Sequence, residues 1–116
     1  MKIAIIGTRS PTISYEEWLS LLLSNVDMST VTEIISGGAR GIDRYAKRVA
    51  KAYNIPLTEY LPEYSIYGRA AALIRNIDIV KSADMVIAFP SQTSRGTHHA
   101  ILQAKKYNIP VIIVNI

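Results

Sequence analysis

Residues 31–43 read Val-Thr-Glu-Ile-Ile-Ser-Gly-Gly-Ala-Arg-Gly-Ile-Asp, and this stretch indicates the fold. Val31 to Ile35 is short, apolar and rich in β-branched residues, which is typical of a strand covered on both faces. The strand is expected to end at Ser36-Gly37-Gly38. A helix is expected from Ile42, because apolar residues recur at helical spacing as far as Tyr53. A strand, a glycine turn and a helix in this order form the repeating unit of a parallel sheet.

The same succession continues along the whole chain. Short apolar runs bounded by turn residues predict four more strands, at Ile3–Ile6, Leu57–Leu61, Met85–Phe89 and Val111–Val114. We therefore predict an α/β fold, a single Rossmann-like three-layer domain over residues 1–116, with a five-stranded parallel sheet and helices on both faces. In such sheets ligands bind outside the carboxyl ends of the strands, where the strand order reverses.

The expected helices carry recognisable starts and ends. Ser14 and Glu17 form a capping box that predicts the start of the first helix. Apolar residues at helical spacing predict two further helices, near residues 70–80 and 97–107. The residues Tyr-Asn-Ile-Pro occur twice, at 53–56 and 107–110, and each copy is expected to connect a helix to a strand, because proline cannot continue a helix.

Composition excludes several classes of protein. Of the 116 residues 49% are hydrophobic and 19% are charged, which excludes intrinsic disorder. Cysteine is absent, so disulfides, thiolate metal sites and a cysteine nucleophile are excluded. We see no signal peptide or membrane-spanning run, and expect a soluble cytoplasmic protein with no membrane partner. The net charge of +4 suits an anionic ligand.

Three loops after predicted strands combine glycine, a hydroxyl residue and arginine: Gly7-Thr8-Arg9-Ser10, Ser36 to Gly41, and Ser94-Arg95-Gly96-Thr97. Glycine lets a backbone approach a ligand closely, and arginine grips phosphate with two donors. Backbone amides at a helix start also bind anions. The loops together predict a pocket for a phosphate-bearing molecule. The alternative is that these residues have no binding role, because glycine, serine and threonine are common in loops and arginine is common on surfaces. No Gly-Lys-Ser/Thr follows the glycines, so this is not a P-loop.

Four motifs follow one another in the chain: Ser36-Gly-Gly-Ala-Arg-Gly-Ile-Asp43, Arg75-Asn76, Ala83-Asp84 before an apolar strand, and Gly96-Thr97. In this order they resemble the motifs of the SLOG superfamily. This group of small Rossmann-like proteins includes the DNA-uptake protein DprA and the "lonely guy" cytokinin-activating hydrolases. The resemblance is greatest to its small prokaryotic and phage branch with the Gly-Gly-Ala-Arg-Gly-(Ala/Ile)-Asp loop, and it spans essentially the whole chain. It implies that nucleotides or nucleotide-derived ligands bind at the glycine loops.

The resemblance also implies a possible reaction, phosphoribohydrolase action on nucleoside 5′-monophosphates. Arg75 falls on the arginine that these hydrolases use, but Asn76 replaces the basic residue that follows it. Gly96 and Thr97 match their Gly-Thr, whereas Ala100 stands where their glutamate should be. Cleavage of an N-glycosidic bond favours a nearby carboxylate, which alanine cannot supply.

Several residues have two interpretations. Asp43 could bond ribose hydroxyls or replace the missing base, or it could only cap the second helix. A basic stripe on that helix is either a solvated face or a track for single-stranded nucleic acid. Tyr64 and Tyr67, in the stretch from Glu63 to Gly68 that is expected to be irregular, could stack on a base, pack over the sheet edge or contact a second subunit. His98 and His99 are adjacent and lack metal-ligand spacing, so no metal is expected.

The leading hypothesis is a protein that binds a nucleotide or nucleotide-derived molecule as a sensor or by sequestering it. The first alternative is the phosphoribohydrolase, with catalytic Arg75 and Asp43, and whether the chain is an enzyme stays open. The second alternative is DprA-like binding of single-stranded DNA. No cofactor is expected. A homo-oligomer is expected, with Trp18, Leu21–Leu23 or the third helix at the interface. The predicted ligand- and phosphate-binding residues are Gly7, Thr8, Arg9, Ser36, Gly37, Gly38, Ala39, Arg40, Gly41, Asn76, Gly96 and Thr97.

Overall fold

Five parallel strands form one sheet in the order β3-β2-β1-β4-β5, in a computed structural model that describes all 116 residues. Along the chain the strands are β1 (Lys2–Gly7), β2 (Glu33–Ser36), β3 (Leu57–Glu59), β4 (Met85–Phe89) and β5 (Val111–Ile113). In the central pair, Ile5 of β1 lies opposite Ile87 of β4. The predicted α/β fold with a five-stranded parallel sheet is confirmed.

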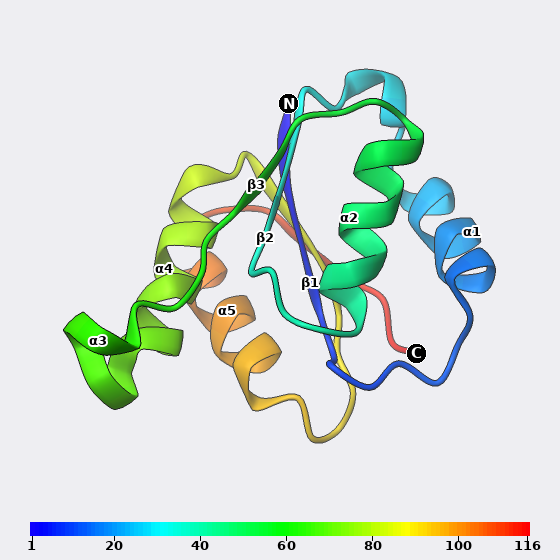
Figure 1. Ribbon diagram of the computed structural model, residues 1–116. Helices are drawn as coiled ribbons and strands as arrows, with labels where there is room; N and C mark the ends of the chain where they lie inside the picture. The colour runs from blue at the N-terminus through cyan, green and yellow to red at the C-terminus, as the bar shows by residue number, and fades with distance from the viewer.

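Helices cover both faces of the sheet (Figure 1). On one face lie α1 (Tyr15–Asn25) and α2 (Ile42–Ala52), and on the other α4 (Ala71–Ser82) and α5 (Arg95–Lys106). Side chains alternate along a strand, so Ile3 and Ile5 face α1 and α2 while Ala4 and Ile6 face the other pair. Three short helical turns, η1 (Met28–Thr30), α3 (Tyr64–Tyr67) and η2 (Gly68–Ala70), complete the fold.

Two local predictions are confirmed at the helix ends. At the start of α1 the Ser14 hydroxyl accepts from the Glu17 amide, and the Glu17 carboxylate accepts from the Ser14 amide, both at 3.1 Å. Both Tyr-Asn-Ile-Pro segments follow a helix, and each forms the same kind of C-terminal cap. Asn54 and Asn108 have φ values of 56° and 58°. Each following isoleucine amide donates to a carbonyl of the last helical turn at 2.8 Å.

Some element boundaries differ from those predicted. The strand predicted from Val31 begins at Glu33, because the Val31 amide is used to close η1 by donating to Met28. Residues 64–67, expected to be irregular, form the short helix α3. The last helix begins at Arg95, before the expected Thr97, which places Gly96 and Thr97 inside its first turn.

The chain order of the strands creates a switch point at the middle of the sheet. From β1 the chain moves outward through β2 to β3, and then crosses to β4 on the other side of β1. The loops after β1 and β4 therefore diverge at the carboxyl ends of these strands, and a crevice forms between them. No helix combines the length and apolar character needed to span a membrane.

Candidate phosphate-binding site

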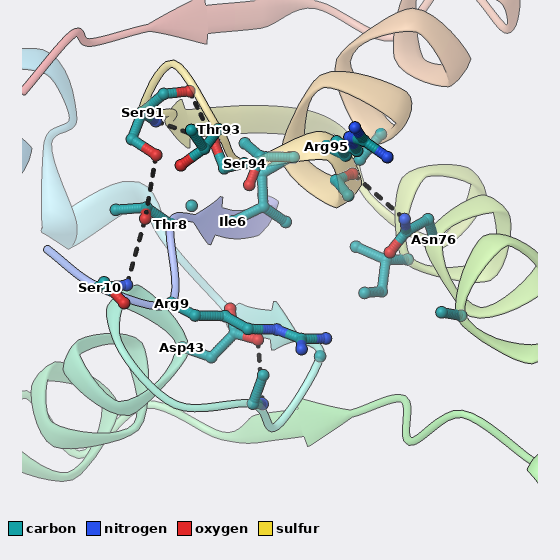
Figure 2. A pocket seen from close by; sticks show the side chains of 18 of the residues that line it. Ile6, Thr8, Arg9, Ser10, Asp43, Asn76, Ser91, Thr93, Ser94 and Arg95 are labelled. Atoms are coloured by element: carbon teal, nitrogen blue, oxygen red, sulfur yellow. Dashed lines mark hydrogen bonds between the residues drawn. The ribbon is translucent and has the colours of Figure 1, made fainter.

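A cavity of about 1070 Å³ opens at this switch point. It is bounded by the loops after β1, β2 and β4, by the first turn of α5 and by one face of α4 (Figure 2). Of the residues predicted from the sequence to form the site, ten line the cavity: Gly7, Thr8, Arg9, Gly37, Ala39, Asp43, Arg75, Asn76, Gly96 and Thr97. The carboxyl ends of β1 and β4 thus hold residues from three loops around one space.

Positive charge dominates the cavity wall. Four arginines line it, Arg9, Arg69, Arg75 and Arg95, against one acidic side chain, that of Asp43. The charged side chains of the wall therefore sum to a formal charge of +3 (four arginines less one aspartate), against a net charge of +4 for the whole chain. None of these arginines is in a salt bridge, because the one salt bridge of the protein joins Arg48 to Glu16. Unpaired guanidinium groups around a concave surface favour an anionic ligand.

The start of α5 adds uncharged donors to the same wall. Ser94 is the N-cap residue, but its hydroxyl does not cap the helix. It instead accepts from the Ser91 amide at 2.8 Å and donates to the Ser91 carbonyl at 2.9 Å. The first amides of a helix have no partner within the helix, so those of Gly96 and Thr97 remain available beside the cavity. This arrangement suits a phosphate group.

The loops that frame the cavity are fixed to one another. Thr8 is buried, and its hydroxyl accepts from the Ser10 amide at 3.2 Å and from the Ser91 hydroxyl at 3.3 Å (Figure 2). Gly41 has a φ of 76°, and a Cβ there would collide with the Thr8 carbonyl and lie 2.6 Å from the Arg9 Cα. Glycine is therefore required where the two loops touch.

Asp43 stabilises the glycine loop rather than capping α2. Its carboxylate accepts from the Ala39 amide at 3.0 Å, and the residue is only 9% exposed. Burial raises the pKa of Asp43 above its ordinary value, and the hydrogen bond from Ala39, the Ser36 hydroxyl and the Arg75 charge oppose this shift only in part. Asp43 also lines the cavity.

Arg75 has one end engaged in the fold. Its Nη1 donates to the Gly37 carbonyl at 2.8 Å and to the Tyr60 carbonyl at 3.4 Å. A side chain at Gly37 would displace this guanidinium, since a Cβ there would lie 2.6 Å from Nη1. Burial lowers the pKa of Arg75, the Asp43 charge raises it, and the nearby Arg9 lowers it again. Arg75 thus holds the glycine loop as well as facing the cavity.

The amide of Asn76 is used entirely within the protein. Its Oδ1 accepts from the Arg75 Nε at 3.1 Å, and its Nδ2 donates to the Gly96 carbonyl at 3.2 Å. The His99 Nδ1 lies 3.3 Å from the same nitrogen, and burial lowers the pKa of that histidine. Asn76 therefore links α4 to the first turn of α5, and positions that turn.

Four of the predicted site residues lie outside the cavity wall, namely Ser36, Gly38, Arg40 and Gly41. Ser36 is fully buried. The loop turns at Gly38 and Gly41, which both have positive φ, and leaves Arg40 on its exposed side. Arg40 therefore does not line this cavity, and its role as a cationic partner of a ligand stays a prediction. The basic residues along α2 are exposed and also lie outside the cavity.

Sequence reasoning missed part of the wall. Arg69, which directly follows the stretch expected to be irregular, lines the cavity, and so do Ser91, Gln92 and Thr93 from the loop after β4. Arg95 was noted in a glycine loop but not placed among the binding residues. The available signal was position, because each of these residues follows a strand or precedes a helix at the same sheet edge.

Comparison with known proteins identifies relatives. Residues 1–58 match the family described as DNA recombination-mediator protein A. The gene 61 protein of Mycobacterium phage D29 is 36% identical in an alignment of 85 residues, with 68% of each chain covered. Two solved structures share the fold. DNA processing protein A from Helicobacter pylori, described for its single-stranded DNA binding mode, has a TM-score of 0.73 at 22% identity over 97% of this chain. DNA processing protein A (DprA) from Streptococcus pneumoniae has a TM-score of 0.78 at 16% sequence identity, over 97% of this chain. This chain spans 64% and 49% of those two chains.

Proposed function

Since the chain belongs to the DNA recombination-mediator protein A family, of the SLOG type, we propose that it binds single-stranded DNA through phosphates held in the cavity at the β1–β4 switch point. Single-stranded DNA was the second alternative drawn from the sequence, after a free nucleotide and a hydrolase. Membership of this family favours it over the other two, and the H. pylori protein with the same fold is described as binding such DNA. The binding surface proposed here is the cavity and its rim.

One observation carries the proposal. Four arginines that form no salt bridge and the open amides of α5 surround a cavity whose one acidic side chain has a raised pKa. Phosphate is the group that such a set of donors recognises. Arg9 extends across the cavity beside Asp43, and Arg95 projects from the start of α5 (Figure 2), so both guanidinium groups can reach a backbone that crosses the opening.

The first test measures the affinity for a labelled oligo(dT) of twelve nucleotides by fluorescence anisotropy. If three or four phosphates are neutralised, the affinity falls about 20- to 50-fold between about 50 and about 200 mM salt. In the double variant Arg9→Gln, Arg95→Gln we expect at least about a tenfold loss, with a salt slope smaller by about 1.4.

A second double variant, Arg44→Gln with Lys47→Gln, is the matched control. It also removes two positive charges, but from the exposed face of α2, outside the cavity. We expect its affinity to stay within about twofold of the parent protein, because surface charges at a distance are screened by salt. Equal losses in both double variants would contradict the proposal, since they would show binding governed by net charge alone.

A second candidate is a free nucleoside 5′-monophosphate, which the same cavity could bind and hydrolyse to the base. The observation that favours it is the buried Asp43 carboxylate inside the cavity, because hydrolysis of an N-glycosidic bond benefits from such a group. The measurement is release of free base from a panel of monophosphates. The hydrolase is excluded if no base is released, or if the rate in Arg75→Ala equals that of the parent protein.

A further inference from the structure

A projecting segment beside the cavity exposes large apolar side chains. Residues 63–70, which comprise α3 and η2 and are named here the tyrosine lobe, are exposed at every position. Tyr64 is 57% exposed, Ile66 66% and Tyr67 46%. Figure 1 shows α3 standing away from the body of the protein, at the end of the sheet where the strands finish. So many exposed apolar side chains in one short segment mark a contact surface.

The tyrosine lobe meets the cavity at its carboxyl end and adjoins the glycine loop at its amino end. At its carboxyl end Arg69 lines the cavity, followed by Ala72 and Leu73 on α4. Just before the lobe, Leu61 packs on the glycine loop, since a Cβ on Gly38 would lie 2.6 Å from the Leu61 Cδ2. The Tyr64 phenol is near enough to Arg75 to influence the pKa of that guanidinium. The lobe therefore forms one rim of the arginine-lined cavity.

We propose that Tyr64 and Tyr67 form a stacking platform for bases of a strand whose phosphates occupy the cavity. This inference rests on the proposed function. Residues three apart on a helix lie on the same face, with Cβ atoms about 5–6 Å apart, so the two rings can receive neighbouring bases. Arg69 then meets the phosphate between the platform and the cavity. Stacking accepts any base, so the platform adds affinity without sequence preference.

The charges of the rim favour nucleic acid over a second copy of this chain as the occupant. A copy seated on the tyrosine lobe would bring a +4 protein next to a cavity wall that itself carries +3. Like charges at that distance oppose association. A polyanion on the lobe instead brings negative charge to the arginines.

The experiment compares two twelve-nucleotide strands, oligo(dT) and a strand of abasic sites with the same backbone. The parent protein is expected to bind oligo(dT) more tightly than the abasic strand. Tyr64→Ala weakens binding of oligo(dT) by at least about fivefold and leaves binding of the abasic strand unchanged. Tyr64→Phe keeps the ring and restores affinity. In Tyr64→Trp, oligo(dT) quenches the fluorescence of the added tryptophan, while the buried Trp18 does not respond.

The matched control is Tyr53→Ala, which removes a tyrosine of similar exposure, 42%, from the far end of α2. Its affinity for both strands is expected to equal that of the parent protein. The platform is disproved if Tyr64→Ala and Tyr67→Ala bind oligo(dT) as tightly as the parent protein does. It is also disproved if these substitutions turn a dimer into a monomer by sedimentation without changing DNA affinity. Failure of the parent protein to bind either strand would instead reject the proposed function itself.

Discussion

At the scale of single residues, some side chains of the cavity wall stabilise the loops of the protein itself through hydrogen bonds. Arg75 and Asp43 were predicted as catalytic residues, yet both hold the glycine loop, through the Gly37 carbonyl and the Ala39 amide. A buried group that is already hydrogen-bonded has a fixed position, which is useful for recognition because no ordering is needed on binding. Their catalytic role stays a prediction, whereas their structural role is visible in the contacts.

The raised pKa of Asp43 makes stability depend on pH. The folded state holds the proton more tightly than the unfolded chain, where the carboxyl pKa is near 3.8. The contribution of the Asp43 carboxyl group to the free energy of unfolding is therefore complete below pH 3.8 and is lost as pH rises through the raised pKa. In Asp43→Asn, whose amide oxygen can still accept from Ala39, we expect thermal stability to exceed that of the parent protein at neutral pH. The difference should be smallest near pH 4. A difference that does not change with pH would contradict this account.

At the scale of elements, the two ends of α5 are built by opposite means. Its carboxyl end has a complete cap, in which Asn108 takes a positive φ and the Ile109 amide donates to Ala104. Its amino end lacks a side-chain cap because the Ser94 hydroxyl is turned to Ser91. An uncapped helix start costs stability unless another group satisfies its amides. At α5 that group is expected to be the ligand phosphate.

Substitutions at Gly96 separate stability from binding. A Cβ there would have only the Asn76 Nδ2 nearby, at 4.0 Å, so a side chain fits. Gly96→Ala keeps the backbone donors and should gain up to about 1 kcal/mol of stability without loss of oligo(dT) affinity. Gly96→Asp should be at least as stable as the parent protein, since an acidic residue in the first turn gains about 0.3–1 kcal/mol. Its affinity should fall at least about tenfold. Equal affinities of the two variants would show that α5 does not bind phosphate.

At the scale of the whole molecule, folding concentrates a modest net charge into one cavity. Residues from Thr8 to Thr97 meet there because the parallel sheet brings the ends of β1 and β4 side by side. The basic residues on α2 remain on the outer surface, where Arg48 lies over the Tyr15 ring at 4.0 Å and pairs with Glu16 at 3.8 Å. Trp18 is fully buried, so it cannot supply the subunit interface that its sequence position suggested, and self-association stays a prediction.

Binding at a cavity formed only by the folded chain should stabilise the whole domain. Oligo(dT) at about 100 times its dissociation constant should add about 2.7 kcal/mol to the free energy of unfolding. In a domain of this size that corresponds to a rise in Tm of about 8–15 °C, measured by thermal melting at low salt. The rise should shrink as salt increases. Binding seen by anisotropy without any rise in Tm would mean that the unfolded chain binds DNA equally well, and would refute a folded site.

The sequence by itself determined the architecture, because the signals for it are local. Apolar runs of strand length, the Ser14–Glu17 capping box and the two Tyr-Asn-Ile-Pro connections each act over a few residues, and their sum allows only a parallel sheet with helices on both faces. It also predicted that the glycine loops follow the carboxyl ends of the strands. Only the tertiary structure decided which side chains line the cavity. Arg69 and Arg95 face it and Arg40 does not, because the direction of a side chain depends on where each helix begins and how each loop turns.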